Sequence, residues 1–598
     1  MKFLLTAVNA KYIHSNLGIY SLKAYAHAFI SQKAEEEPQH SEAYKRIRIE
    51  LAEYTINQQP DEILQDIYRQ KPQVIGFSCY IWNIWHIRQI LREIPKILPG
   101  TDIWLGGPEA FCNARRLLEE EPSVTGIMAG EGEGILADLA VYYGTNEIIP
   151  EEGLKDGYLR QIPGILFRDR QGQIVKTGDR PLLDLDTIPF PYTDLDGMEH
   201  RILYYESSRG CPYRCSYCLS SIDRTVRFRS LELVKRELDF FLNHKVPQVK
   251  FVDRTFNCKR SHALAVWKYL LEHDNGITNF HFEIAGDGIG QEELAVFGKM
   301  RKGLIQLETG VQSTNPQTIE EIRREMDLHR LGKAVAAINS CQNIHQHLDL
   351  IAGLPFEGLE SFKKSFDDVY AMRPEQLQLG FLKVLSGSYM AEMAGEYGIL
   401  YHETPPYEVL STKWLTYEEI LQLKAVEEMT EVYYNSRQFT QTLKEMEKHW
   451  ESSYAMFEEM AWYYETRKLF GIRHNRLARY EILYDFLRQQ GGDMEQYRDL
   501  LVCDLYLREN LKSRPSFARD LTPWKERIRL FFREEEKQPR YLKGYEGYDA
   551  RQMGSMAHVE VMGDGSMILF DYKNRDALTY NAKAVKIDDQ SSGRLCGG

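Results

Sequence analysis

One stretch decides the fold of this chain: SRGCPYRCSYCL, residues 208–219. Its three cysteines, Cys211, Cys215 and Cys218, have the spacing C-x3-C-x2-C. Three thiolates from one tight loop can bind three irons of a cubane cluster and leave the fourth iron open for an exchangeable ligand. A structural zinc site normally has a fourth Cys or His, so zinc and a plain buried cysteine cluster are the weaker interpretations. The spacing therefore predicts a 4Fe–4S cluster.

Strand-like runs alternate with helical patterns after this stretch. Because these runs recur roughly every 25 to 40 residues, they predict a β/α barrel over residues 201–395, nearer six units than eight. The cysteine loop follows the first of these strands. The predicted strands are LYYESSRG, VKFVDRTF (249–256), NFHFEIAG (279–286), LIQLETGVQ (304–312), HQHLDLIAGLP (345–355) and QLQLGFLKVL (376–385).

The regions on either side of the barrel have different patterns. Residues 1–145 contain five strand–helix units, which predict an open parallel sheet with helices on both faces. Residues 146–200 are interpreted as a linker with a hairpin at 164–178, followed by an extended stretch that contains prolines. Residues 396–598 are predicted to be mainly helical, with a small β-containing portion from about 545. The expected fold class is therefore α/β, with a Rossmann-like domain, a partial (β/α)6 barrel and a mainly helical C-terminal domain.

Composition narrows the class of protein. The chain has 598 residues, 43% of them apolar, and a net charge of −13, which argues against DNA binding through phosphate neutralisation. No apolar run approaches the roughly 20 residues that cross a bilayer, and the first residues fit a strand better than a signal peptide. The odd number of cysteines, nine, fits a reducing compartment. We expect a multidomain cytoplasmic protein.

The cysteine loop resembles the signature loop of the radical S-adenosylmethionine (radical SAM) superfamily. The match RGCPYRCSYC includes Tyr217, the aromatic residue just before the third cysteine. The resemblance implies that the open iron binds the amino and carboxylate groups of S-adenosylmethionine. It also implies that one electron, from a donor such as flavodoxin or ferredoxin, cleaves this molecule to a 5′-deoxyadenosyl radical.

The strand ends of the barrel resemble the coproporphyrinogen dehydrogenase-like branch of that superfamily. The resemblance implies that Glu283 contacts the ribose of S-adenosylmethionine and that Gln312, Arg324 and Asp349 are further contacts. A carboxylate, an amide and a guanidinium suit ribose hydroxyls and the methionine carboxylate. Taken singly, each of these residues also suits an ordinary loop or helix surface. Their common register with the cysteine triplet favours a site.

The second predicted strand of the barrel ends in VDRTF, residues 252–256. Many family members have a glycine-rich stretch here that contacts the amino group of S-adenosylmethionine. In this chain Asp253, Arg254 and Thr255 replace that stretch, and from their position the resemblance implies cofactor contacts for Asp253 and Thr255.

Residues 1–145 resemble the cobalamin-binding domain of cobalamin-dependent radical enzymes. The matching points are IGFS (75–78), GGPE (106–109), GEGE (130–133) and the linker stretch LDTIPFP (185–191). The absence of G-x-G-x-x-G after the first strand argues against a dinucleotide. Glycines at strand ends let the backbone approach a flat, bulky ligand. The expected cobalamin contacts are Ser78, Gly106, Gly107, Gly130, Glu131 and Gly132.

His14 lies in the loop after the first strand, in the stretch YIHSNLG (12–18). Many cobalamin proteins have Asp-x-His-x-x-Gly here, with the histidine as a cobalt ligand. This chain lacks the aspartate that would orient the imidazole. Cobalt ligation by His14 and a hydrogen-bonding contact with the nucleotide tail or the loop both stay open.

The three cofactors, namely the 4Fe–4S cluster, S-adenosylmethionine and cobalamin, imply an enzyme that methylates an unactivated carbon through methylcobalamin. The alternatives are a cobalamin-dependent rearrangement or cyclisation, a cobalamin-free oxidative radical enzyme, and a non-catalytic iron–sulfur or haem binding module. The substrate is left open as a small molecule, a peptide or an RNA. Basic and aromatic segments at 467–480 and 537–545 fit an anionic ligand, but they also fit the solvated faces of amphipathic helices.

Overall fold

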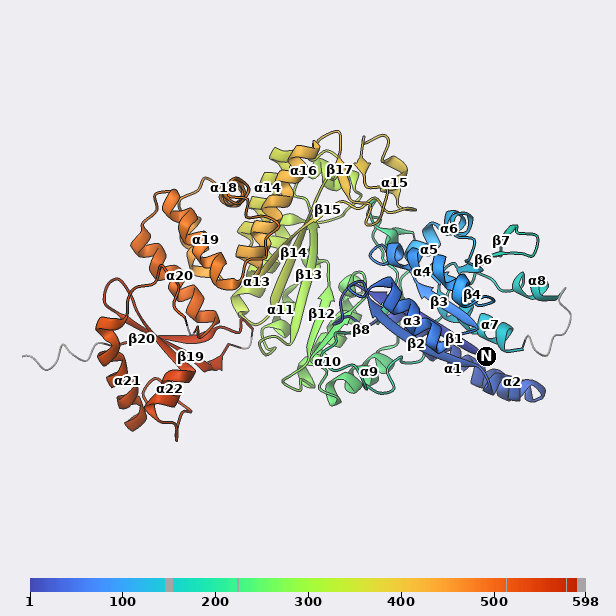
Figure 1. Ribbon diagram of the computed structural model, residues 1–598, viewed down its shortest axis with the longest axis horizontal. Helices are drawn as coiled ribbons and strands as arrows, with labels where there is room; N and C mark the ends of the chain where they lie inside the picture. Colours follow the sequence, from blue (N-terminus) through green and yellow to red (C-terminus); the bar gives the residue numbers. More distant parts are fainter. Residues whose placement is uncertain (146–153, 223–224, 512, 577, 589–598) are drawn as a thin grey trace, which may run out of the picture.

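The computed structural model describes residues 1–145, 154–222, 225–511, 513–576 and 578–588. The molecule is elongated, with the first β/α domain and the C-terminal helices at opposite ends of a central sheet (Figure 1). Among the described helices, none combines the length and the apolar character needed to cross a membrane.

The N-terminal domain contains a seven-stranded sheet in the order β2-β1-β3-β4-β5-β6-β7. Its first five strands are parallel, as predicted, whereas β6 and β7 form a hairpin that pairs antiparallel with β5. The predicted hairpin therefore extends the first sheet instead of standing alone in a linker, because its apolar strand ILFR covers the edge of β5. The strands are β1 (Lys2–Asn9), β2 (Arg48–Thr55), β3 (Val74–Ser78), β4 (Asp102–Gly106), β5 (Gly126–Met128), β6 (Ile165–Arg168) and β7 (Ile174–Lys176).

Helices cover both faces of this sheet because alternate side chains of each strand point to opposite faces. On β1, Phe3 and Leu5 join one apolar core, and Leu4 and Val8 join the other. The helices α1 (Leu17–Glu36) and α7 (Gly132–Thr145) pack on the first face. The second face is covered by α3 (Pro60–Gln70), α4 (Ile84–Ile97), α5 (Pro108–Cys112) and α6 (Ala114–Glu120).

The central domain is a six-stranded parallel sheet whose strands lie in chain order, which confirms the predicted partial barrel. On β13, buried residues such as Leu307 alternate with half-buried ones such as Glu308, so one face of the strand packs on helices and the other lines the barrel interior. The strands are β8 (Leu203–Tyr205), β11 (Gln248–Phe251), β12 (Asn279–Glu283), β13 (Ile305–Gln312), β14 (His345–Ala352) and β15 (Gln376–Phe381). The helices include α9 (Leu231–Asn243), α10 (Arg260–Glu272), α11 (Gln291–Phe297), α12 (Pro316–Glu321), α13 (Leu328–Cys341) and α14 (Leu359–Ala371).

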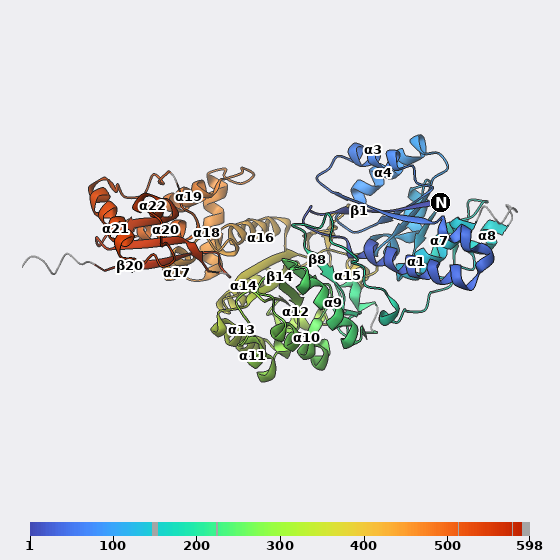
Figure 2. The ribbon, with the colours of Figure 1, turned by 90° about the horizontal axis from the view of Figure 1, so that it is seen from below.

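The C-terminal region shares its core with the barrel. One apolar cluster runs from Val311 on β13 through Phe366 on α14 to Tyr480 on α19. Figure 2 shows the region extending from the side of the sheet that carries β14 and α14. It contains α15 (Tyr389–Met393), β16 (Leu400–Tyr401), β17 (Val409–Ser411), α16 (Tyr417–Met429), α17 (Thr440–Met446), α18 (Ser453–Thr466), α19 (Arg476–Gln489), α20 (Met494–Arg508), α21 (Lys525–Lys537), α22 (Ala550–Met556) and the antiparallel sheet of β18 (Ala557–Val561), β19 (Met567–Arg575) and β20 (Ala582–Ile587).

Candidate functional site

The cysteine loop is closed at its base by two short strands. These strands, β9 (Ser208–Arg209) and β10 (Arg227–Phe228), pair antiparallel. Gly210 follows β9 with φ +100, and a Cβ placed on it would lie 2.3 Å from the backbone oxygen of Thr225, so only glycine fits. Cys211 and Cys215 are buried and Cys218 is half-buried, and all three are free thiols. The loop therefore holds three unbridged thiols next to one another along a single tight turn.

Asp253 anchors the approach to this loop. Its carboxylate accepts hydrogen bonds from Ser207 N at 3.0 Å, from Ser207 Oγ at 2.7 Å and from Ser208 Oγ at 2.6 Å. The side chain is buried, and burial raises the pKa of Asp253 to about 6. Both carboxylate oxygens thus hold the approach to the loop, and the expected contact of Asp253 with a cofactor stays a prediction.

A cavity of about 150 Å³ lies beside the cysteine loop, at the carboxyl ends of β12, β13 and β14. Two residues of this cavity contact the cysteines: Arg324 Nη1 lies 3.7 Å from Cys215 Sγ, and Thr255 Oγ1 lies 3.8 Å from Cys211 Sγ. The structure thus brings together five of the residues singled out in the sequence. The cavity is lined by Tyr213, Thr255, Glu283, Gln312, Arg324 and Asp349, among others.

Several buried polar atoms in this cavity have no hydrogen-bond partner among the described residues. They include Gln312 Oε1, Arg324 Nε and Asp349 Oδ1. The register of β13 against β14 shifts between Gly310 and Gln312, and Gln312 has φ +75, so a bulge re-aims its side chain. Buried polar groups are normally paired. The three unpaired atoms are an amide oxygen, a guanidinium N–H and a carboxylate oxygen. Together they fit a ligand that has hydroxyl and carboxylate groups, as S-adenosylmethionine does.

Tyr217 does not line this cavity. It packs against the apolar cluster of β13, β14 and the C-terminal helices. Burial raises the pKa of Tyr217 well above its usual range, so the phenol stays neutral. The structure thus places this residue in the wall behind the loop.

A second polar group inside the barrel is absent from the sequence prediction. His281 Nε2 lies 2.8 Å and Lys250 Nζ lies 3.2 Å from Glu308 Oε2. Burial alone would raise the pKa of Glu308, but contact with His281 and the charge of Lys250 outweigh it and lower the pKa to about 2. His347 on β14 lies on the other side of Glu308. The alternation of polar and apolar residues along these strands is the signal that indicates such an interior row.

In the N-terminal domain, the predicted glycine positions lie at the carboxyl ends of neighbouring strands. Ser78 ends β3 and pairs in register with Gly106, which ends β4. Gly107 has φ +97, and a Cβ on it would lie 2.6 Å from the backbone oxygen of Cys79, so the turn itself requires glycine. Gly130 has φ +112 and open space around it. Gly132 begins α7 and lies against Leu22 of α1.

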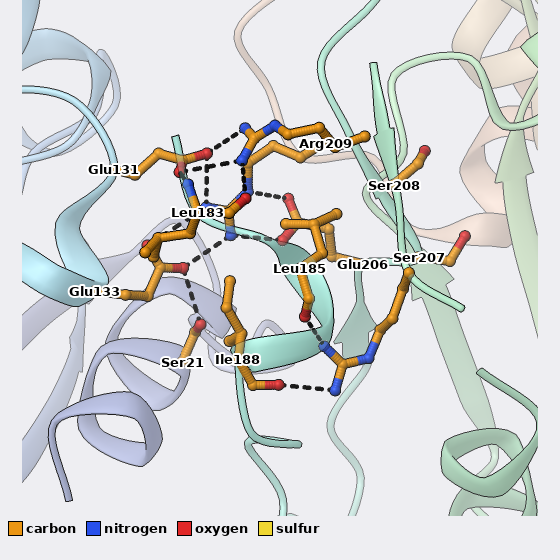
Figure 3. Close-up of polar contacts among 12 residues, drawn as sticks. Ser21, Glu131, Glu133, Leu183, Leu185, Ile188, Glu206, Ser207, Ser208 and Arg209 are labelled. Atoms are coloured by element: carbon orange, nitrogen blue, oxygen red, sulfur yellow. Dashed lines mark hydrogen bonds and ion pairs between the residues drawn. The ribbon is translucent and has the colours of Figure 1, made fainter. Parts of the chain in front are cut away.

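Glu131 and Glu133 do not face an open strand edge but the barrel (Figure 3). Arg209, which precedes the cysteine loop, lies 3.1 Å from Glu131 and 2.8 Å from Glu133. Glu131 also accepts from Arg227 and from Leu183 N. Burial raises the pKa of Glu131, but these hydrogen bonds and charges outweigh it and lower the pKa. The carboxylate of Glu131 therefore docks the two domains, and its expected contact with cobalamin stays a prediction.

His14 also contacts the barrel. Its Nδ1 lies 2.7 Å from the hydroxyl of Tyr204 on β8, and Ile202 N donates to Ile13 O at 2.7 Å. Burial, followed by the charges of Lys11 and Lys250, lowers the pKa of His14, so its imidazole is uncharged at neutral pH. The hydroxyl of Tyr204 thus holds the imidazole of His14 from the side of the barrel.

A larger cavity of about 740 Å³ lies between the N-terminal domain and residues 384–407. Tyr407 donates a hydrogen bond of 2.5 Å to the buried carboxylate of Glu109, which joins the two walls. Other lining residues include Trp85, Arg88, Arg116 and Tyr401.

Two segments of the chain match family models, which together correspond to a B12-binding domain in front of a radical SAM barrel. Residues 4–140 match the B12 binding domain, and residues 205–369 match the radical SAM superfamily. Residues 395–577 match a family described as a protein of unknown function (DUF4080). The two cofactor-binding families imply a 4Fe–4S cluster, S-adenosylmethionine and cobalamin as the cofactors.

Among curated proteins, the chain is 25% identical over 353 residues to the cobalamin-dependent radical SAM methyltransferase TokK of Streptomyces tokunonensis, covering 55% of this chain and 50% of that protein. It is 21% identical over 316 residues to the anaerobic magnesium-protoporphyrin IX monomethyl ester cyclase of Rubrivivax gelatinosus, covering 51% and 55%. The chain thus spans about half the length of these relatives.

Two solved structures share the fold. TsrM from Kitasatospora setae, a radical S-adenosylmethionine methyltransferase with cobalamin and a [4Fe-4S] cluster bound, has a TM-score of 0.53 at 15% identity and covers 68% of this chain and 82% of its own. OxsB, a cobalamin-dependent radical enzyme with aqua-cobalamin and S-adenosylmethionine bound, has a TM-score of 0.56 at 16% identity and covers 83% and 78%.

Proposed function

We propose that this chain is a cobalamin-dependent radical SAM enzyme that methylates an unactivated carbon of its substrate. The observation that carries the proposal is the meeting of three features: the cysteine loop, the cavity lined by Glu283, Gln312 and Arg324, and the B12-binding domain docked on the loop through Arg209. TokK and TsrM, which resemble this chain, are both named methyltransferases.

In this proposal, Cys211, Cys215 and Cys218 hold the cluster, and the neighbouring cavity holds S-adenosylmethionine. The cluster, when bound, supplies the electron that cleaves S-adenosylmethionine, and cobalamin supplies a carrier for the methyl group. Arg324, whose guanidinium lies at Cys215, orients the methionine carboxylate. Glu283 and Asp349 accept from the ribose hydroxyls.

Four further residues are given roles within the same proposal. Thr255, at the end of the second strand, lies at the cluster side of the cavity and faces the amino group of S-adenosylmethionine. Gln312 supplies an amide to the same molecule, and Tyr217 shields the loop from water. On the cobalamin side, His14 is held by Tyr204 and contacts the corrin or its tail.

The expected cobalamin contacts in the N-terminal domain lie at the strand ends, where glycine leaves room for a flat ligand. Ser78 and Gly106 offer adjacent backbone edges of β3 and β4. Gly107, Gly130 and Gly132 begin the next loops and α7.

The proposal is tested by labelling. The protein is reconstituted with iron, sulfide and cobalamin without oxygen, reduced, and incubated with S-adenosylmethionine carrying a deuterated methyl group and with a small-molecule cell extract. We expect both 5′-deoxyadenosine and S-adenosylhomocysteine, together with a deuterated product. Substitution of Cys215 by alanine removes 5′-deoxyadenosine and the deuterated product, because both need the cluster. Substitution of Cys341, a cysteine outside the loop, leaves all three products. Absence of both nucleoside products from the loaded wild-type protein contradicts the proposal.

Ring formation or rearrangement is the second candidate, because cyclases are among the relatives at similar identity. A cyclase of Synechocystis is 26% identical over 282 residues and covers 44% of this chain and 52% of its own length. In the same experiment, 5′-deoxyadenosine without S-adenosylhomocysteine or a deuterated product favours this candidate over methylation.

We further infer a cytoplasmic enzyme that takes its electron from flavodoxin or ferredoxin. The support is chemical: all eight cysteines in the described part of the chain are free thiols, as in a reducing compartment. The substrate class stays open between a small molecule, a peptide and an RNA.

A further inference from the structure

The interior of the barrel is polar, which is unusual because barrel interiors are normally filled by branched apolar side chains. Three carboxylates lie on neighbouring strands: Glu283 on β12, Glu308 on β13 and Asp349 on β14. Glu283 and Glu308 are partners in register, and Asp349 pairs with Gly310, two residues beyond Glu308. All three line the cavity beside the cysteine loop. Glu308 is therefore the central carboxylate of this row.

Few cations contact these carboxylates inside the barrel. Arg254 also lines the cavity, but it is exposed to solvent, which screens its charge. Lys250 Nζ lies 3.2 Å from Glu308 and 3.7 Å from Glu283, so one ammonium is shared by two acids. Burial lowers the pKa values of His281 and His347, which are therefore uncharged at neutral pH. Arg324 is turned toward the loop, where it contacts Cys215 and Gly310 O. An excess of negative charge in a buried cavity is costly unless a cation joins it.

The pKa values of the three carboxylates shift in different directions. Burial and the charge of Glu308 raise the pKa values of both Glu283 and Asp349. The pKa of Glu308 is lowered, because His281 and Lys250 contact one of its oxygens. Glu308 is therefore the carboxylate that keeps its charge whether or not a ligand is present.

A second observation indicates that a ligand belongs here. His347 is only 7% exposed, and neither of its ring nitrogens has a hydrogen-bond partner among the described residues. Its Nε2 lies 3.4 Å from Asp349 Oδ1, so the ring points into the row of carboxylates. A buried imidazole without a hydrogen-bond partner, next to two carboxylates that line the cavity, indicates that a ligand completes this group.

We propose that Glu308, held in place by Lys250 and His281, recognises the positive charge of the sulfonium of S-adenosylmethionine. This inference rests on the proposed S-adenosylmethionine site and adds a residue that the family resemblance does not assign. S-adenosylhomocysteine has the same adenosine and amino acid groups but no sulfonium charge. Glu308 therefore lets the cavity bind S-adenosylmethionine in preference to S-adenosylhomocysteine, the by-product of methyl transfer whose sulfur carries no charge.

The test compares two ligands and two variants. Calorimetric titration of the anaerobically reconstituted protein, with its cluster oxidised so that no cleavage occurs, gives the affinity for each ligand. Glu308→Gln keeps the size of the side chain and removes its charge. We expect this variant to bind S-adenosylmethionine at least about tenfold more weakly and S-adenosylhomocysteine within about twofold of the wild type. Iron content, measured in parallel, reports whether the cluster is retained.

Glu320→Gln is the matched control, because Glu320 on α12 does not line the cavity and is exposed to solvent, which screens its charge. It should leave the ratio of the two affinities unchanged. If Glu308→Gln weakens the binding of both ligands equally, or changes the binding of neither, the sulfonium assignment is overturned. Either result leaves the proposed function standing. A wild-type protein that binds neither ligand overturns the proposed function as well.

Discussion

At the scale of single residues, Arg324 links the cysteine loop to the cavity. Its guanidinium contacts both Cys215 Sγ and Gly310 O, and its Nε has no partner among the described residues. Arg324→Lys keeps the charge but loses the planar fork that pairs with a carboxylate. We expect S-adenosylmethionine to bind about tenfold more weakly at unchanged iron content, measured by titration and iron analysis. Unchanged affinity would mean that Arg324 serves the loop alone.

The buried carboxyl group of Glu357 should make the stability of the folded protein depend on pH. It is fully buried, accepts hydrogen bonds from Ser313 and Ser365, and burial raises its pKa to about 7. Between its unfolded value of about 4.5 and about 7, the folded chain holds a proton that the unfolded chain releases, so stability falls as pH rises through this window. The loss amounts to at most about 3 kcal/mol.

Glu357→Gln imitates the protonated acid and should remove this part of the pH dependence. Thermal unfolding at pH 5 and pH 7.5 measures it: the wild type loses more stability between the two than the variant does. An identical loss in both proteins would show that Glu357 does not titrate in this range.

At the scale of elements, closure of the cysteine loop depends on the turn after β9. Gly210→Ala would place a Cβ 2.3 Å from a backbone oxygen at φ +100, so the two strands at the base of the loop cannot pair. We expect the variant to keep less than about a tenth of the wild-type iron after reconstitution, because three thiolates must be held together to bind a cluster.

Gly172→Ala is the control for backbone strain alone. Gly172 has φ +76 but no atom within 4 Å of its would-be Cβ, so the change costs about 1 kcal/mol and leaves iron binding intact. Full iron loading in Gly210→Ala would contradict the role given to this turn.

The elements could largely be predicted from the sequence, and the reasons are local. Apolar and polar residues alternate along stretches such as IQLETGVQ, which indicates strands that pack on helices with one face only. The spacing of these strands along the chain predicts six units. The use of Glu131 could not be predicted. Its partner Arg209 is 78 positions away in the chain, and a glutamate in a glycine-rich loop gives no sign of which charge it will meet. The polar interior around Glu308 was not predicted: alternation along β13 is a signal for it, but the contact of Glu308 with Lys250 depends on how the sheet closes.

At the scale of the whole molecule, the two cofactor domains are joined by buried charges. Arg209 contacts Glu131, Glu133 and Glu206, and the side chain of Glu133 is only 6% exposed. Arg209→Met removes the cation that these three carboxylates share; Glu131 keeps Arg227, whereas Glu133 keeps only the hydroxyl of Ser21. The change should destabilise the docked arrangement by about 3 kcal/mol. We expect a protease to cleave the variant faster than the wild type between residues 178 and 200, and gel electrophoresis measures the rate.

Arg92→Met provides the comparison, because Arg92 is 63% exposed and its ion pair with Glu121 contributes little. Equal cleavage of the two variants would mean that Arg209 does not hold the domains together.

The central claim is that one chain brings an iron–sulfur cluster, S-adenosylmethionine and cobalamin to a common site. Electron paramagnetic resonance of the reduced, reconstituted protein tests it most directly. The account predicts a cluster signal that changes shape when S-adenosylmethionine is added, together with a cobalamin signal when cobalamin is present. It also predicts loss of the cluster signal alone when Cys211, Cys215 and Cys218 are replaced by alanine. A cluster signal that persists in this triple variant, or that ignores S-adenosylmethionine in the wild type, would contradict the account.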